Sequence, residues 1–88
     1  NMVENIDNEF KMISTQISTA DFHANNEDKL KLYGLYKQST VGDNNTSKPF
    51  IFQLEASAKW TSWNYYKGIN TPDAKNQYIT FAKQLLNK

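Results

Sequence analysis

The chain has 88 residues, which corresponds to one small domain that can bury roughly 60–65% of its unfolded surface. It contains no cysteine, which excludes disulfides, thiolate metal sites and a cysteine nucleophile. Its ten basic residues, all lysines, are spread along the chain against nine acids, and a net charge of +1 argues against generic binding to nucleic acid or to an anionic membrane.

An apolar stripe predicts the first helix. Apolar residues recur at alternating spacings of three and four, which is typical of the buried face of an amphipathic helix. The stripe consists of Val3, Ile6, Phe10, Ile13, Ile17 and Ala20. The pattern fades over residues 21–24, where we expect the helix to have ended.

The second predicted helix begins at the Asn25-Asn26 pair. Asparagine is a good N-cap, and the acids Glu27 and Asp28 favour the positive end of the helix dipole in the first turn. We expect this helix to run to about Val41 and to end at Gly42, which suits the position after a helix.

A long loop is expected over residues 43–54. Turn-forming residues open it, and Pro49 disfavours helical geometry at the residue before it. A loop of this length in a small domain either passes over a functional site or connects distant helices. We expect apolar residues in its second half to anchor it to the core, namely Phe50, Ile51, Phe52 and Leu54.

Two further helices complete the chain. The third is predicted over residues 56–67 and ends at Gly68, and for the last we expect Thr71 as N-cap, with Pro72 and Asp73 following. The buried stripe of the last helix is Ala74, Tyr78, Phe81, Ala82, Leu85 and Leu86. The sequence thus predicts one domain over residues 1–88, an all-α four-helix bundle with unequal connections.

The second predicted helix carries a polar aromatic stripe. Tyr33, Tyr36, Lys37 and Thr40 follow the spacing i, i+3, i+4, i+7, which places them on one face, whereas Leu35 points elsewhere. Two phenol rings and an ammonium on one face suit a ligand that combines a flat ring with phosphates. Thr40, at the end of the stripe, is interpreted as structural.

The third predicted helix offers a second cluster. Trp60 and Trp63 share a face, and Lys59 lies one turn from Trp63. Core packing is the simpler interpretation of the two tryptophans. Lys59 borders this apolar surface, which leaves its ammonium available to a phosphate.

Catalysis is not favoured. His23 is the sole histidine and lies near a helix boundary, with no cysteine and no carboxylate clearly placed to orient it. Asp43 and Glu55 are separated by a loop that defines no geometry for an acid pair, and the glycines are too scattered for a phosphate loop. We therefore expect no enzyme, no cofactor and no metal site.

The same sequence indicates where the protein acts. It has no apolar run long enough to span a membrane and no N-terminal pattern of a signal peptide. We expect a soluble cytoplasmic monomer without stable membrane insertion and without a nucleic-acid partner.

Several ordered blocks resemble the acyl-CoA-binding protein family. They are the run Tyr-Gly-Leu-Tyr-Lys-Gln-Ser-Thr-Val-Gly-Asp at 33–43, the turn Asn-Thr-Ser-Lys-Pro at 45–49, and Ala-Lys-Trp-Thr-Ser-Trp-Asn at 58–64. Lys67-Gly68 and the late Ala74-x-x-x-Tyr78-Ile79 pair are similarly spaced, and the resemblance extends from Phe10 onward.

The resemblance implies a four-helix carrier that binds long-chain acyl-CoA thioesters without converting them. Tyr33, Tyr36 and Lys37 match positions that contact the nucleotide half of coenzyme A. Lys59 matches the lysine that, with Tyr33, holds the ribose 3′-phosphate, and Tyr78 matches a tyrosine near the adenine. Leu30, Gly34 and Leu35 match positions in or beside the same helical lining.

Some of these roles have alternatives. Gly34 suits a close approach of helices as well as ligand contact, and Tyr78 shares its stripe with core residues. The face formed by Tyr33, Tyr36 and Lys37 also suits a helical interaction module that docks a partner protein. An isomerase, to which such domains occur fused, would need more chain than is present here.

The chain departs from the family pattern at three places. Ser18 and Glu55 stand where many relatives carry basic residues, so we expect weaker phosphate contact or a shifted ligand preference. The segment 50–52 is bulkier than the glycine-containing version common in the family, and we expect its rings to narrow the acyl groove. The preferred chain length stays open.

Overall fold

A computed structural model describes residues 2–88, with side chains from residue 5 onward. Within this part the chain forms four helices and no strand: α1 (Met2–Thr19), α2 (Asn26–Thr40), α3 (Leu54–Tyr65) and α4 (Thr71–Leu86). The predicted all-α fold is confirmed. The predicted burial of Val3 lies outside the described side chains.

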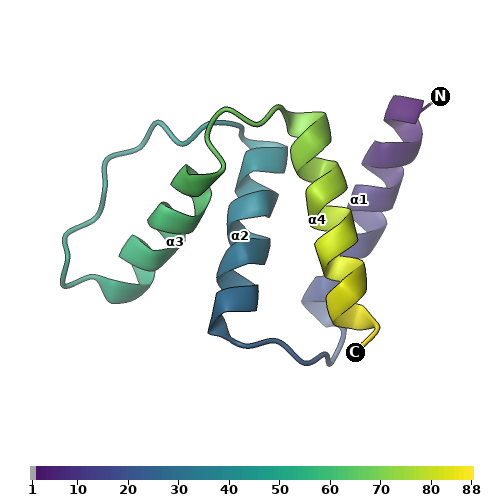
Figure 1. Ribbon diagram of the computed structural model, residues 1–88, viewed down its shortest axis with the longest axis horizontal. Helices are drawn as coiled ribbons and strands as arrows, with labels where there is room; N and C mark the ends of the chain where they lie inside the picture. Colours follow the sequence, from purple (N-terminus) through teal and green to yellow (C-terminus); the bar gives the residue numbers. More distant parts are fainter. Residues whose placement is uncertain (1) are drawn as a thin grey trace.

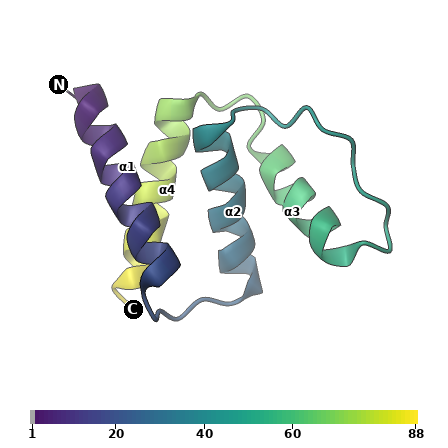
Figure 2. The same ribbon diagram turned by 180° about the vertical axis from the view of Figure 1, so that it is seen from behind.

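The helices lie side by side in a row, in the order α1, α4, α2, α3 (Figures 1 and 2). Helix α4 packs against α1 and α2, and among the described helices α3 packs against α2 alone. The molecule is correspondingly flat, with extents of 42 × 28 × 16 Å. Helix α3 is therefore an end helix that is held on one face.

Helices α2 and α3 run in the same direction, which explains the long connection between them. On α2, Tyr33 precedes Lys37, and their contacts on α3 follow in the same order. The ammonium of Lys59 lies over the ring of Tyr33, and the ammonium of Lys37 lies over the ring of Trp63. Neighbouring helices of the same direction require the chain to return along their length, which residues 41–53 do (Figure 1). The unequal connections expected from the sequence follow from this geometry.

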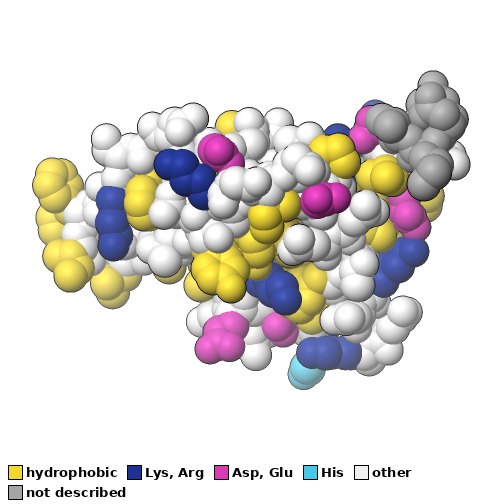
Figure 3. Space-filling model, turned by 45° about the horizontal axis from the view of Figure 1, so that its top comes forward, with side chains coloured by type: hydrophobic (Ala, Val, Ile, Leu, Met, Phe, Trp, Pro, Cys, Tyr) yellow, Lys and Arg dark blue, Asp and Glu magenta, His cyan; other side chains and the backbone are white. Residues whose placement is uncertain are grey.

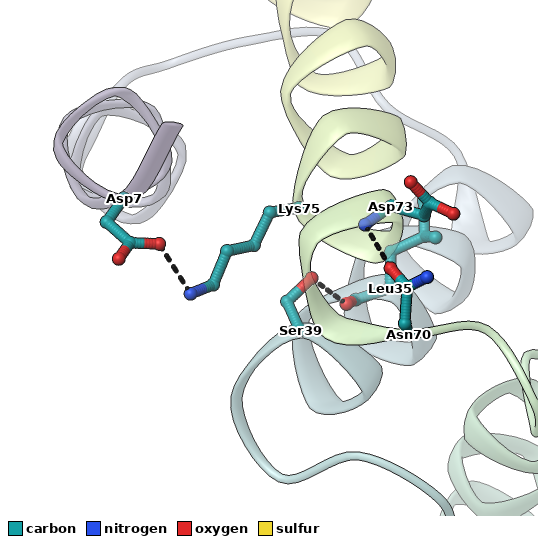
Figure 4. Close-up of polar contacts among 6 residues, drawn as sticks. All are labelled: Asp7, Leu35, Ser39, Asn70, Asp73 and Lys75. Carbon is teal, nitrogen blue, oxygen red and sulfur yellow. Dashed lines mark hydrogen bonds and ion pairs between the residues drawn. The ribbon is translucent and has the colours of Figure 1, made fainter. Parts of the chain in front are cut away.

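The core lies between α1, α2 and α4. Its buried members are Phe10, Ile13, Leu32, Leu35, Tyr66, Tyr78, Ile79, Ala82 and Leu85. Further residues of the two predicted stripes pack at its edge, namely Ile6, Ile17, Phe81 and Leu86. Ala20 is an exception, because α1 ends one residue before it and leaves it exposed. An ion pair of 2.7 Å between Asp7 and Lys75 joins α1 to α4 outside this core (Figure 4).

The ends of α2 agree with the predicted caps. The side chain of Asn25 accepts from the backbone N–H of Asp28, whose carboxylate accepts in return from the backbone N–H of Asn25. This reciprocal capping box satisfies two amides that the helix itself leaves free. The chain leaves the helix through Gly42, whose φ of +97° is a conformation that favours glycine.

Three predicted boundaries shift. Helix α3 begins at Leu54 and ends at Tyr65, earlier at both ends than the predicted 56–67. The N-cap of α4 is Asn70 rather than Thr71, because the Asn70 side chain accepts from the backbone N–H of Asp73 at 2.9 Å (Figure 4). Asparagine caps at least as well as threonine, so the helix starts at its first suitable cap.

The expectation that apolar residues anchor the long loop is wrong. Phe50, Ile51, Phe52 and Leu54 are between 72% and 86% exposed. Polar groups hold the loop instead, because the indole N–H of Trp63 donates to the carbonyl of Gly42 at 2.7 Å and that of Trp60 donates to the carbonyl of Thr46 at 3.0 Å. The predicted narrowing of a groove by the two phenyl rings is also wrong, since they project into solvent.

Asp43 fastens the start of this loop to the turn that precedes α4. Its carboxylate accepts from the side-chain amide of Gln38 at 2.9 Å and from the backbone N–H of Gly68 at 2.8 Å. The Gly68 hydrogen bond, followed by that from Gln38, lowers the pKa of Asp43. The interpretation of Asp43 as a turn residue rather than a catalytic acid agrees with these contacts.

Candidate functional site

The predicted tyrosines of α2 line a hollow between α1, α2 and α4. Tyr36 is 42% exposed, and its ring stacks on Phe10 with centroids 5.7 Å apart. Tyr78 of α4 lies against both rings, 5.1 Å from Phe10 and 6.0 Å from Tyr36. We call this space the tyrosine hollow; it encloses about 600 Å³ and is lined by Ser14, Thr15, Ile17, Ser18, Phe22, Lys29, Leu32, Tyr33, Tyr36 and Tyr78.

A second concave surface follows the contact between α2 and α3. It consists of two adjoining hollows of about 480 and 580 Å³ that share Leu30, Leu54 and Ala58. The first hollow, which we call the near end, also includes Lys59 and Tyr33, whereas the second, the far end, is mostly apolar and includes Ile51 and Tyr65. We call the two together the seam groove.

Tyr33 belongs to both surfaces, because it lines the tyrosine hollow and the near end of the seam groove. It is half-buried, and the ammonium of Lys59 lies 5.5 Å from its ring centroid. The structure therefore brings together an aromatic ring and a cation from two helices at the point where the two concave surfaces meet. A bound molecule could reach both surfaces from this point.

Glu55 offsets part of the positive charge of Lys59 at this junction. Its carboxylate lies 3.2 Å from the ammonium of Lys59, one turn along α3. The pair is solvent-exposed, so its own contribution to stability is small, about 0–1 kcal/mol. It does mean that an incoming phosphate would compete with Glu55 for Lys59, as the sequence suggested.

Lys37 is directed along the contact between α2 and α3. Its ammonium lies 4.7 Å from the ring centroid of Trp63, which is buried. This cation–π contact holds Lys37 on the side of α2 that faces α3, where Lys59 also lies. Trp63 thus takes the core-packing role that the sequence favoured, while supporting a cation above it.

Two predicted lining residues are buried in packing contacts. A Cβ added to Gly34 would lie 2.5 Å from the backbone oxygen of Ser62, so Gly34 permits the close approach of α2 and α3. Leu35 is fully buried in the core. Neither residue lines the tyrosine hollow or the seam groove. The structure therefore favours the packing alternative for Gly34 and gives Leu35 a packing role.

Burial of Tyr78 changes its acidity. The side chain is 3% exposed, and desolvation, with a smaller contribution from Tyr36, raises the pKa of Tyr78 to about 12. Its ring forms the floor of the tyrosine hollow and is also part of the core. The structure thus shows the core-packing alternative for Tyr78, and its contact with a ligand stays a prediction.

The raised pKa of Tyr78 predicts a loss of stability in alkali. The phenol ionises near pH 10 in the unfolded chain and near pH 12 in the folded protein, so the folded state loses stability as pH rises from 10 to 12. The expected loss reaches about 2–3 kcal/mol by pH 12. Urea titrations at several pH values across this range should measure the loss. The free energy of unfolding of Tyr78→Phe should fall less steeply with pH, and equal slopes for the two proteins would contradict the assignment.

Lys29 is a candidate that the sequence reasoning missed. It is exposed on α2 and lines both the tyrosine hollow and the near end of the seam groove. Its spacing of i, i+4 to Tyr33 places the two on the same face and could have revealed it. Ala58 was missed in the same way, although it lies one turn after Leu54 along the seam groove.

Other candidate chemistry is located elsewhere. His23 is exposed and lines neither the tyrosine hollow nor the seam groove. Among the described residues no group of three or more acids and histidines could hold a metal ion. In the part of the chain that the structure describes, no helix combines the length and apolar character needed to cross a membrane.

Comparison with known proteins identifies relatives over most of the chain. Residues 7–82 match the family model described as "Acyl CoA binding protein". The chain is 47% identical over 77 residues to "Acyl-CoA-binding domain-containing protein 3" of Oryza sativa, covering 88% of this chain and half of that protein. It is 44% identical over 80 residues to "Acyl-CoA-binding protein" of Ricinus communis, covering 91% of this chain and 89% of that protein.

Solved structures agree with these matches. The crystal structure of Oryza sativa Acyl-CoA-Binding Protein 2 superposes with a TM-score of 0.92 at 41% identity, covering 97% of this chain and 92% of that one. The solution structure of the acyl CoA binding protein from Babesia bovis superposes with a TM-score of 0.80 at 38% identity, covering 91% and 92%. The arrangement of the helices in a row is thus shared with both.

Proposed function

This chain belongs to the acyl-CoA-binding protein family, and on that premise we propose that it binds long-chain fatty acyl-CoA thioesters and acts as a cytoplasmic carrier and pool former. One observation carries the proposal: a tyrosine and lysines gather at one end of a groove whose far end is apolar. A ligand with an anionic nucleotide at one end and a fatty chain at the other matches both ends.

The nucleotide end is proposed to lie at the junction around Tyr33. The ammonium groups of Lys59 and Lys29 are available there to phosphate, which lysine binds as a compact point charge. The tyrosine rings of the adjoining hollow offer aromatic surface to an adenine, with Tyr36 partly exposed. Lys37, whose ammonium lies over Trp63 on the side of α2 that faces α3, is proposed as a further contact for the anionic part of the ligand.

The acyl chain is proposed to lie along the seam groove. Leu30, Leu54 and Ala58 line both of its hollows, and Ile51 extends the apolar surface outward. Each buried methylene contributes about 0.8 kcal/mol, so even partial burial of a fatty chain supplies a large share of the binding free energy. This places the thioester between the junction and the apolar groove.

The geometry favours a small-molecule ligand over the alternative of a protein-interaction module. The ring of Tyr36 stacks on Phe10, and Lys37 is held over Trp63, so neither projects as a free anchor. The residues line concave spaces, which suit a ligand better than a flat protein surface. We further propose that the thioester leaves unconverted, because His23 lies away from both surfaces.

Lys59→Ala is expected to weaken binding of palmitoyl-CoA by about 1.5–3 kcal/mol, the scale of a hydrogen bond to a charged group. Isothermal titration calorimetry measures the change directly. Lys11→Ala is the matched control, because Lys11 is exposed on α1 and lines neither the tyrosine hollow nor the seam groove.

Glu55→Gln supplies the opposite test. Removing the carboxylate 3.2 Å from the ammonium of Lys59 frees that lysine for phosphate, so binding should tighten. If Lys59→Ala and Lys11→Ala weakened binding equally, the placement of phosphate beside Lys59 would be wrong. If no acyl-CoA bound the unmodified protein, the proposed function itself would fail.

A further inference from the structure

The long loop carries an exposed apolar surface that the proposed ligand site does not fully use. Phe50, Ile51, Phe52 and Leu54 are 72%, 86%, 77% and 76% exposed, and we call these four the apolar tip. The two phenyl rings stack on each other, with centroids 5.7 Å apart and planes 5° from parallel. Figure 3 shows hydrophobic side chains gathered at the end of the molecule that the long loop forms. Clustered exposure of this kind marks an interaction surface.

The apolar tip is continuous with the seam groove. Ile51 lines one hollow of the groove and Leu54 lines both, whereas Phe50 and Phe52 line neither. The tip therefore borders the groove through Ile51 and Leu54. Whatever covers the tip also lies against the groove that is proposed to hold the fatty chain.

The charges around the apolar tip suit an anionic or zwitterionic partner. Between Asp43 and Glu55 the only charged residue is Lys48, which is exposed. The ammonium of Lys48 lies 5.8 Å from the ring centroid of Trp60. Glu55 lies beside the tip, but its carboxylate is engaged by Lys59. A cation next to apolar side chains matches the layering of phosphate groups above acyl chains in a bilayer.

The size of the apolar tip argues against a second copy of the chain as its occupant. An aromatic side chain buries about 150–250 Å², and two such rings with two aliphatic side chains fall short of the ~800 Å² per partner of a standard interface. The tip is also a projection at one end of a flat molecule rather than a broad face (Figure 3). A bilayer requires no matching surface and accepts projecting apolar side chains.

We propose that the apolar tip docks on the surface of a phospholipid bilayer, with Phe50 and Phe52 entering the boundary between headgroups and acyl chains. Docking of this kind is peripheral and reversible, and it positions the opening of the seam groove at a membrane that supplies or receives acyl-CoA. The benefit of docking for delivery of acyl-CoA rests on the proposed function, whereas the docking itself is inferred from the exposed apolar side chains of the loop.

Vesicle flotation tests the proposal with the intact protein. Vesicles of phosphatidylcholine alone, and of phosphatidylcholine with phosphatidylserine at about two to one, are the two probes. The double substitution Phe50→Ser/Phe52→Ser should reduce the bound fraction at least about tenfold on both, because two apolar rings are lost. Lys48→Gln should reduce binding about fivefold on the anionic vesicles and little on the neutral ones.

The matched control is Met12→Ser/Val41→Ser, which removes two other exposed apolar side chains that lie away from the apolar tip. Its vesicle binding should equal that of the unmodified protein. The proposal is overturned if the unmodified protein does not float with either vesicle, or if both double variants lose binding equally. It is also overturned if sedimentation shows a dimer that the tip substitutions disperse, since the occupant would then be a second copy.

Calorimetry with octanoyl-CoA in the absence of vesicles separates this inference from the proposed function. Phe50 and Phe52 line neither hollow of the seam groove, so the double variant should bind octanoyl-CoA like the unmodified protein. Loss of vesicle binding with unchanged octanoyl-CoA binding supports docking by the tip. Vesicle binding by a protein that binds neither octanoyl-CoA nor palmitoyl-CoA would refute the proposed function while leaving the docking surface in place.

Discussion

Palmitoyl-CoA is expected to bind this chain at least about a thousandfold more tightly than free coenzyme A. Burying only about six methylenes in the seam groove contributes ~5 kcal/mol, and a thousandfold ratio needs about 4 kcal/mol. The nucleotide contacts are common to both ligands and cancel in the ratio. Calorimetry with coenzyme A and with a series of its esters measures the increment per methylene.

A pair of substitutions on α3 tests whether the seam groove is the cause. Ala58 lines both hollows of the groove, so Ala58→Phe should fill it and remove most of the dependence on chain length. Ala56→Phe adds the same ring two residues away, at an exposed position that lines neither hollow, and should leave the dependence intact. A chain-length dependence that survives Ala58→Phe would place the acyl chain elsewhere.

Leu35→Ala is expected to lower the free energy of unfolding by about 2–5 kcal/mol. Leu35 is fully buried where α2 meets the core, so truncation removes apolar contacts and leaves a cavity. Urea denaturation followed by circular dichroism measures the loss. For a domain of this size a loss of that magnitude is a large fraction of the total stability.

Leu54→Ala is the matched control for this loss. Leu54 is 76% exposed, so the same truncation there should change stability by no more than about 0.5 kcal/mol. Because Leu54 lines the seam groove, the control should instead weaken binding of long-chain esters. Equal destabilisation by both substitutions would contradict the division between a core face and a ligand face.

Local sequence signals were sufficient to predict most of the helices. The capping box at Asn25 and the exit through Gly42 depend on a few neighbouring residues, so they could be read from the chain. The cap of α4 was misplaced by one residue because Asn70 and Thr71 are both good caps. Only the hydrogen bond from the backbone N–H of Asp73 distinguishes them.

The long loop could not be predicted in the same way. Apolar residues such as Phe50 and Phe52 were expected inside because local composition does not reveal whether a core is within reach. The loop is fixed by indole N–H groups of Trp60 and Trp63, which belong to a helix later in the chain. Contacts of this kind become visible only once the direction of α3 is known.

The candidate site was predicted in part. Helical spacing correctly placed Tyr33 and Tyr36 on one side of α2, and the structure brings Lys59 beside Tyr33. Spacing could not show that Leu35 is fully buried, because burial depends on the helices packed around α2. The ligand contacts assigned to individual residues stay predictions that the binding experiments above decide.

The position of α3 at the end of the row has an evolutionary consequence. Its groove-lining residues, such as Ala58, lie on the far side of α2 from the core, so many of them can be exchanged at little cost to folding. Selection for a new ligand can then act on α3 and the long loop while α1, α2 and α4 preserve the fold. The arrangement separates adaptation of the binding surface from the mutational burden on stability.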